Sequence, residues 1–151
     1  MPDKATPIKR QAPTRSNVGF ELAKASQHWN ELLAEAFAAQ GFPEVRPAFG
    51  SVLLPLFEED GLRMGEIAAR ARLSKQTITT LVRRVLRAGL ARRVDDPSDG
   101  RASRIELTER ALEFAPVAAD VVRELERRVG AGLTDDEYRA LRKGLRTVTQ
   151  L

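Results

Sequence analysis

The stretch from Met64 to Val85 places the strongest constraint on the fold, because it encodes two short helices with only a few residues between them. Ala68 is small enough to let two helices approach each other, and Leu73 supplies an apolar side chain to the turn. Ser74 is a residue type that caps helix N-termini, and Gly89 is one that ends helices. Between them, apolar residues recur at the spacing of one helix face: Ile78, Leu81, Val82, Val85 and Leu86. The segment therefore predicts a helix-turn-helix.

The opposite face of the second helix is polar and basic. It carries Lys75, Gln76, Thr79, Thr80, Arg83 and Arg87. Side chains of these lengths reach base edges and phosphates from within the major groove of DNA, and Ser74 and Thr77 are placed to reach phosphate. The alternative is an ordinary helical hairpin whose polar face meets water. Arg72 stands in the turn at a position where many such motifs have glycine.

A β-hairpin is predicted directly after this helix. Apolar and polar residues alternate through residues 90–94 and 103–107, and residues 95–100 (DDPSDG) are dense in turn formers. A hairpin in this position is a wing. Arg101 is placed to enter the minor groove, where negative potential favours arginine. Asp99 is placed to hold that guanidinium in a fixed direction by a charge-assisted pair.

The N-terminal third is predicted to hold a flexible basic arm and two helices. Residues 1–16 contain three prolines and four basic side chains, so we expect them to form the arm. A helix is predicted from Val18 to about Gln40. A second helix starts near Pro47, and Pro55 should kink or shorten it. The acidic run of residues 58–60 is expected to be a solvated loop.

The C-terminal third is predicted to hold two more helices. Thr108 should open a long helix that Pro116 interrupts. Residues 134–137 (TDDE) have the pattern of a capping box for the last helix. We expect the last helix to bury a face made of Leu141, Leu145 and Val148.

Composition and charge narrow the class of function. The 151 residues include no cysteine, which excludes disulfides and thiolate metal sites. Residues 62–107 carry eleven basic side chains against five acidic ones, whereas the chain as a whole has a net charge of +4. A basic centre with acidic flanks is typical of a nucleic-acid-binding protein, although a solvated surface with uneven charge is the simpler alternative.

Catalysis has little support in the sequence. His28 is the single histidine, and no glycine-rich phosphate loop is present. We therefore expect no enzyme activity, no catalytic residue, no cofactor and no bound metal. Since no apolar run approaches the roughly 20 residues of a membrane span, we also expect a cytoplasmic protein without a membrane partner.

These elements together resemble the MarR family of bacterial transcriptional regulators. The resemblance covers residues 18–151, and its most specific part is the DPSDGRA wing (96–102) between two short strands. The other motifs that carry it are GEIA (65–68), LS (73–74), residues 79–82, GL (89–90), LTE (107–109) and LTDDE (133–137). Ala111, where many members have glycine, and Pro116 depart from the family's pattern.

The resemblance implies a mainly α fold with a small β-hairpin wing. A winged helix-turn-helix lobe would occupy residues 45–107, and residues 17–44 and 108–151 would form a helical dimerisation lobe. It also implies a sequence-specific double-stranded DNA-binding regulator, usually a repressor, that acts as a homodimer on a pseudo-palindromic operator and is released by a small, often aromatic, ligand. Gln76, Thr79, Thr80 and Arg83 fall at positions that the family uses for DNA. Arg84 matches a common basic position, or it braces an aspartate of the wing.

Two further questions stay open on sequence alone. His28, Trp29 and Phe49 are weak candidates for an effector crevice, because core or surface packing explains such side chains equally well. The chain could also be an architectural or weakly specific DNA-binding protein, or a winged-helix protein-interaction module. The basic recognition face argues against the interaction module.

Overall fold

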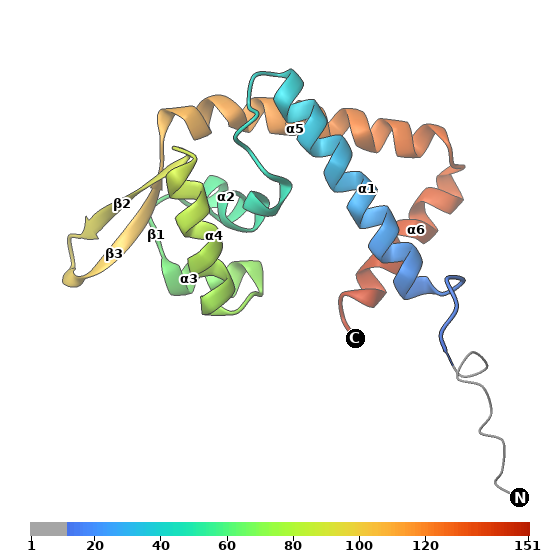
Figure 1. Cartoon of the computed structure of the whole chain (residues 1–151), viewed down its shortest axis with the longest axis horizontal. Coiled ribbons are helices and arrows are strands. Elements are labelled where there is room, and N and C mark those ends of the chain that lie inside the picture. Colours follow the sequence, from blue (N-terminus) through green and yellow to red (C-terminus); the bar gives the residue numbers. More distant parts are fainter. Residues whose placement is uncertain (1–11) are drawn as a thin grey trace, which may run out of the picture. The chain divides into compact units, whose positions relative to one another are not determined.

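The computed structural model describes residues 12–151, so most of the predicted basic arm, residues 1–11, lies outside the described residues. Contacts divide the chain into two units after Leu32. The described helices are α1 (Val18–Ala39), a short 3₁₀ helix (Pro47–Phe49), α2 (Gly50–Glu58), α3 (Met64–Ala71), α4 (Lys75–Arg87), α5 (Glu109–Ala131) and α6 (Asp135–Val148). The strands are β1 (Leu62–Arg63), β2 (Ala91–Asp96) and β3 (Asp99–Leu107) (Figure 1). The predicted mainly α fold with a small β wing is confirmed.

The apolar core of the second unit lies among α2, α3, α4 and the sheet. In α4, Ile78, Val82 and Val85 are fully buried, as the helical spacing predicted. They meet buried residues of the neighbouring elements, which include Val52, Leu53, Leu56, Leu62, Ile67, Leu90 and Ile105. Because this face of α4 is used for the core, its polar face points outward.

The helix ends use the caps that the sequence indicates. The Ser74 hydroxyl accepts a hydrogen bond from the backbone N–H of Thr77 (3.1 Å), and Gly89 ends α4 with a φ of 76°. Arg72 ends α3 in the left-handed conformation, with φ 54° and ψ 41°. The turn therefore keeps the geometry that glycine usually supplies, although a side chain at this φ is strained.

The wing belongs to a three-stranded antiparallel sheet in the order β1-β3-β2. The predicted hairpin is confirmed, with Ala91 opposite Leu107 and Val94 opposite Arg104. β1 is an addition that the sequence pattern did not indicate, since two residues are too few to show alternation. It pairs with β3 only at Ile105 and Arg104, so the hairpin is two-stranded from Ser103 to its tip.

The segment before the sheet departs slightly from expectation. The helix predicted from Pro47 begins as a 3₁₀ turn, and α2 follows from Gly50 with Pro55 buried inside it. Asp60 is exposed, as predicted, but its carboxylate also accepts hydrogen bonds from the backbone N–H of Gly61 and Leu107, each at 2.9 Å. Asp60 thereby holds the end of β3, whereas Glu58, which was predicted to lie in the loop, is the last residue of α2.

The prediction that Pro116 interrupts the long helix is wrong, because α5 runs without a break from Glu109 to Ala131. Proline removes one backbone hydrogen bond, and the burial of Phe114 before it and Leu125 after it offsets that loss. Phe114 is buried against the rings of Phe37 and Phe42, with centroid distances of 4.9 and 5.2 Å. The Arg110 guanidinium lies 3.9 Å from the centroid of the Phe42 ring.

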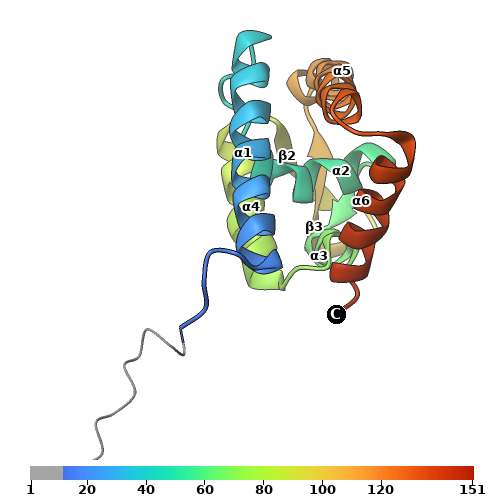
Figure 2. The same ribbon diagram turned by 90° about the vertical axis from the view of Figure 1, so that its right-hand side faces the viewer.

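The predicted buried face of α6 is also wrong for the single chain. The helix starts at the predicted capping box, in which the Glu137 carboxylate accepts from the backbone N–H of Thr134 (2.8 Å), and it follows α5 after a sharp turn (Figure 2). However, Leu141, Leu145 and Val148 are 41%, 44% and 38% exposed. None of the residues of α6 is buried.

None of the described helices, all within residues 12–151, has both the length and the apolar character needed to cross a membrane.

The strained turn gives a test of the fold. We expect Arg72→Gly to raise the free energy of unfolding by roughly 0.5–1 kcal/mol, because glycine adopts φ 54° without the steric cost that a side chain brings. We expect Gly89→Ala, at a φ of 76°, to lower it by about 1 kcal/mol. Urea denaturation of both variants measures the two changes. Equal changes in the two variants would contradict the left-handed turn at Arg72.

Candidate nucleic-acid interface

The outward face of α4 presents the polar side chains that the sequence singled out. Lys75, Gln76, Thr77, Thr80, Arg83 and Arg84 are exposed, and Thr79 is half-buried. The Thr79 hydroxyl donates to the carbonyl of Lys75 (2.7 Å), and the Thr80 hydroxyl donates to the carbonyl of Gln76 (3.2 Å). Each threonine oxygen can therefore still accept a hydrogen bond, and each methyl group can contact an apolar base edge.

The first turn of α4 is fixed by two hydroxyl groups. Besides accepting from the Thr77 N–H, the Ser74 Oγ lies 2.8 Å from the Thr77 Oγ1. Ser74 is therefore the cap of the helix and is also exposed at its N-terminal end. The positive end of a helix dipole favours an anion such as phosphate. Phosphate contact by Ser74 and Thr77 stays a prediction, which their exposure at this end of α4 favours.

Arg84 does not brace the wing. Its guanidinium carbon lies 5.5 Å from the centroid of the Phe49 ring, so it covers this buried side chain from the solvent side. The alternative role that we considered for Arg84 is filled by Arg63 and Arg104 instead. Phe49 was a weak candidate for an effector crevice. In the structure it is only 3% exposed and packs in the core.

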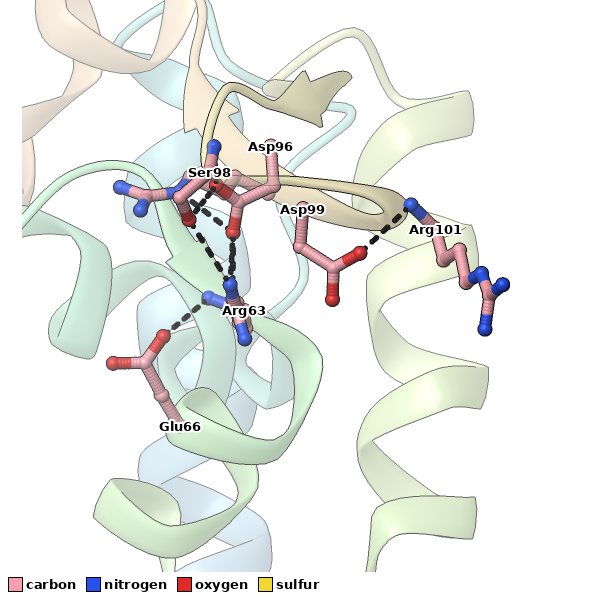
Figure 3. Close-up of polar contacts among 7 residues, drawn as sticks. Arg63, Glu66, Asp96, Ser98, Asp99 and Arg101 are labelled. Atoms are coloured by element: carbon pink, nitrogen blue, oxygen red, sulfur yellow. Dashed lines mark hydrogen bonds and ion pairs between the residues drawn. The ribbon is translucent and has the colours of Figure 1, made fainter.

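Asp99 shapes the tip of the wing through a backbone contact, and not through the predicted pair with the Arg101 guanidinium. Its carboxylate accepts a hydrogen bond from the backbone N–H of Arg101 (3.0 Å), and the Arg101 guanidinium extends away from it (Figure 3). No ion pair joins the two side chains within residues 12–151. Asp99 thus shapes the turn, while the exposed Arg101 remains available to a partner.

The base of the wing holds a buried ionic cluster that the sequence reasoning missed. Asp96 is the one charged residue that is buried among residues 12–151 (2% exposed). One carboxylate oxygen, Oδ2, receives the Arg63 Nε at 2.6 Å and forms ion pairs with the Arg63 Nη2 at 2.5 Å and the Arg104 Nε at 3.2 Å. The other, Oδ1, accepts from the backbone N–H and the hydroxyl of Ser98, at 2.9 and 2.7 Å (Figure 3).

This environment holds the pKa of Asp96 well below its ordinary value. The largest cause is the hydrogen bond from the Ser98 backbone N–H, followed by that from the Ser98 hydroxyl. Arg104 and Arg63 lower the pKa further, against the opposing effect of burial. The local part of the cluster has a sequence signal, because an aspartate commonly accepts from the N–H two residues ahead in a turn. The partner Arg63 has no such signal.

The remaining candidates for ligand contact, His28 and Trp29, lie outside the helix-turn-helix and the wing. His28 is exposed on α1, with its Nδ1 3.6 Å from the Glu31 carboxylate, and Trp29 beside it is half-buried. Both belong to the first unit of the chain. Among residues 12–151, no group of three histidine, aspartate or glutamate side chains is arranged to hold a metal ion.

Comparisons with known proteins point to one family. A model described as the MarR family matches residues 52–102. The helix-turn-helix-type transcriptional repressor IacR of Pseudomonas putida is 33% identical over 97 residues, which are 64% of this chain and 58% of that protein's length. The chain thus spans less than two thirds of this relative.

Solved structures show the same fold. The transcriptional regulator PcaV of Streptomyces coelicolor, in complex with its natural ligand, has a TM-score of 0.74 at 26% identity, covering 92% of this chain and 96% of PcaV. The S. aureus MepR–DNA complex has a TM-score of 0.75 at 18% identity, covering 89% of this chain and 96% of MepR. At this lower identity the likeness concerns the fold alone.

The buried carboxylate predicts a pH dependence of stability. Because the folded pKa of Asp96 lies below its unfolded value of about 3.9, ionised Asp96 contributes stability above about pH 4, and this is lost as the pH falls toward the folded pKa. We expect Asp96→Asn to lower the free energy of unfolding at neutral pH, and the difference from wild type to shrink below pH 4. Urea denaturation at a series of pH values measures this difference.

The exposed neighbour Asp95 provides the matched control. Asp95→Asn removes the same charge without removing the cluster, so its stability curve should follow that of the wild type. A difference between Asp96→Asn and wild type that stayed constant with pH would show that the ionised carboxylate is not what stabilises the fold.

Proposed function

We propose that this chain, which belongs to the MarR family of transcriptional regulators, acts as a homodimer that binds a pseudo-palindromic site in double-stranded DNA. The observation that carries the proposal is the exposed polar face of α4, next to a wing whose Arg101 is also exposed. The relatives named above are regulators rather than enzymes, in agreement with the expectation from sequence.

Charge supports DNA as the partner. Residues 62–107 have a net charge of +6, from eleven basic and five acidic side chains. Several of the basic groups are held in ion pairs, such as Arg92 with Glu106 (3.1 Å) and Arg63 with Asp96. The α4 and wing residues Lys75, Arg83 and Arg101 are exposed. Exposed cations on a helix and a hairpin suit phosphates and groove edges together.

The exposed apolar stripe of α6 supports the homodimer. A single recognition helix covers only a few base pairs, so useful specificity calls for two half-sites and therefore two copies. Leu141, Leu145 and Val148 are apolar side chains that water contacts in the single chain. Packing them across a two-fold axis would bury them and would place two copies of α4 on one duplex.

Repression and ligand release form the finer part of the proposal. IacR, the relative in Pseudomonas putida, is a repressor, and PcaV was solved with its natural ligand. We extend both properties to this chain, with His28 and Trp29 as the residues to examine for ligand contact. Phe49 is a weaker choice, since a ligand would have to displace the Arg84 side chain to reach its ring.

Selection of bound duplexes from a random pool tests DNA reading directly. We expect an inverted repeat, with a slope of log K against log salt concentration on the order of −6 to −10. On the selected duplex, Arg101→Ala should weaken binding by several-fold and leave the dimer intact, whereas Gln76→Ala or Thr79→Ala should change the preferred base. Fluorescence anisotropy with matched and altered duplexes measures both effects.

Arg123→Ala is the matched control, because it removes one exposed arginine of α5, outside the winged helix. It should leave affinity close to that of the wild type. If folded protein recovered no sequence preference over scrambled duplex, an architectural role would replace the proposed one. If Arg101, Gln76 and Thr79 could all be replaced without effect, the assigned surface would be wrong.

The dimer has its own test on α6. Leu145→Glu places a charge in the apolar stripe, so we expect it to shift the protein toward monomer and to reduce affinity for the full palindrome. Lys143→Glu introduces the same side chain on the opposite face of α6 and should leave the dimer intact. Analytical ultracentrifugation at several concentrations measures the oligomeric state. A Leu145→Glu protein that remained a dimer would exclude this stripe as the interface.

A further inference from the structure

We propose that Asp96 is a positioning residue that fixes the wing relative to the helix-turn-helix, so that Arg101 can reach the minor groove. The proposal rests on the proposed function, in which the wing touches DNA. It gives a buried side chain a role in DNA binding that is exerted through Arg101.

The outer part of the wing has few contacts with the rest of the sheet. β1 pairs with β3 only at Arg104 and Ile105, so the outer part of the hairpin has no third strand. A two-stranded hairpin by itself is only marginally stable in water. The Asp96 carboxylate lies in this outer part, at the register shift between Asp95 and Asp96, and is turned into the protein rather than to solvent. It joins this outer part to Arg63, and a longer hydrogen bond from the Arg63 Nη2 to the Ser98 hydroxyl (3.4 Å) lies beside it.

The Asp96 carboxylate joins the turn of the wing to two strands. Its Oδ1 accepts hydrogen bonds from the backbone N–H and the hydroxyl of Ser98 in the turn. Its Oδ2 forms ion pairs with Arg104 of β3 and Arg63 of β1. Three chain segments therefore meet on one side chain (Figure 3). Hydrogen bonds to an ionised and buried group are among the stronger ones in proteins, and a planar guanidinium fixes direction as well as distance.

Arg63 is itself attached to the helix-turn-helix. It is the residue immediately before α3, and its backbone N–H donates to the Glu66 carboxylate at 3.0 Å. α3 in turn packs against α4. One path from the wing tip to α4 thus runs through Asp96, Arg63 and α3, and α4 also contacts β2 directly.

The sign of the change in DNA affinity distinguishes a positioning role of Asp96 from a direct effect of its charge on the phosphate backbone. Asp96→Asn removes a negative charge near the DNA, which by itself would raise affinity for the phosphate backbone. If Asp96 positions the wing, the same substitution lowers affinity by removing the contribution of Arg101. The two explanations therefore predict changes of opposite sign.

A double-mutant cycle on the full-length protein and its selected duplex tests the proposal. In the wild-type background, Arg101→Ala should lower affinity by several-fold, as stated above. In the Asp96→Asn background, we expect Arg101→Ala to change affinity less than about twofold, because the wing no longer presents Arg101 to DNA. In the control background Asp95→Asn, the full effect of Arg101→Ala should remain.

A second readout does not involve DNA. Hydrogen exchange at the backbone amides of residues 99–103 in the free protein should become faster in Asp96→Asn and stay unchanged in Asp95→Asn. If Asp96→Asn failed to fold, Arg63→Lys would replace it, since lysine keeps the charge and loses the planar contact with the carboxylate. We expect the same loss of the Arg101 effect in that variant.

The outcomes separate this inference from the function on which it rests. A full Arg101 effect in both Asp96→Asn and Arg63→Lys, with unchanged exchange at residues 99–103, would overturn the positioning role and leave DNA binding by the wing intact. A wild-type protein that bound DNA without any contribution from Arg101 would overturn the wing contact, and the positioning role with it.

Discussion

Burial of one face of α4 is the constraint on which the rest of the second unit depends. Ile78, Val82 and Val85 are fully buried, so the helix cannot rotate about its axis without exposing them. This fixes the direction of the opposite face, which carries Gln76 and Arg83. Polar residues can vary on such a face with little cost in stability, because they contribute almost nothing to the core. The same packing that stabilises the lobe therefore leaves its outer surface free to recognise a partner.

The two aspartates of the DPSD turn have different structural roles, one local and one long-range. Asp99 is exposed and accepts from the backbone N–H of Arg101, so its effect stays within the turn. Asp96 is buried and pairs with Arg63, which lies 33 residues earlier in the chain. Local hydrogen bonding thus gives the tip its shape, whereas a long-range ion pair decides where the tip lies. Sequence reasoning chose Asp99 because its partner was close in sequence.

The same distinction explains which features the sequence could predict. The helix caps at Ser74, Thr108 and Thr134 were predicted because each depends on residues at most three positions away. β1 was missed because strand pairing, rather than its two-residue pattern, defines it. The break at Pro116 was predicted from local preference alone, and α5 continues because Phe114 and Leu125 are packed on either side of it. Long-range contacts account for each of these differences.

The exposed stripe on α6 links the fold to the symmetry of the proposed DNA site. A helix of 14 residues is marginal in water unless one of its faces is packed, and in the single chain α6 buries none of its residues. In the proposed dimer, a second copy of the chain would offer the same stripe, and a two-fold axis would bring the two into contact. That axis would also relate the two copies of α4 in opposite directions, which is the arrangement an inverted repeat requires. Under the proposed function, the contact that completes α6 is therefore also the one that sets the spacing of the half-sites.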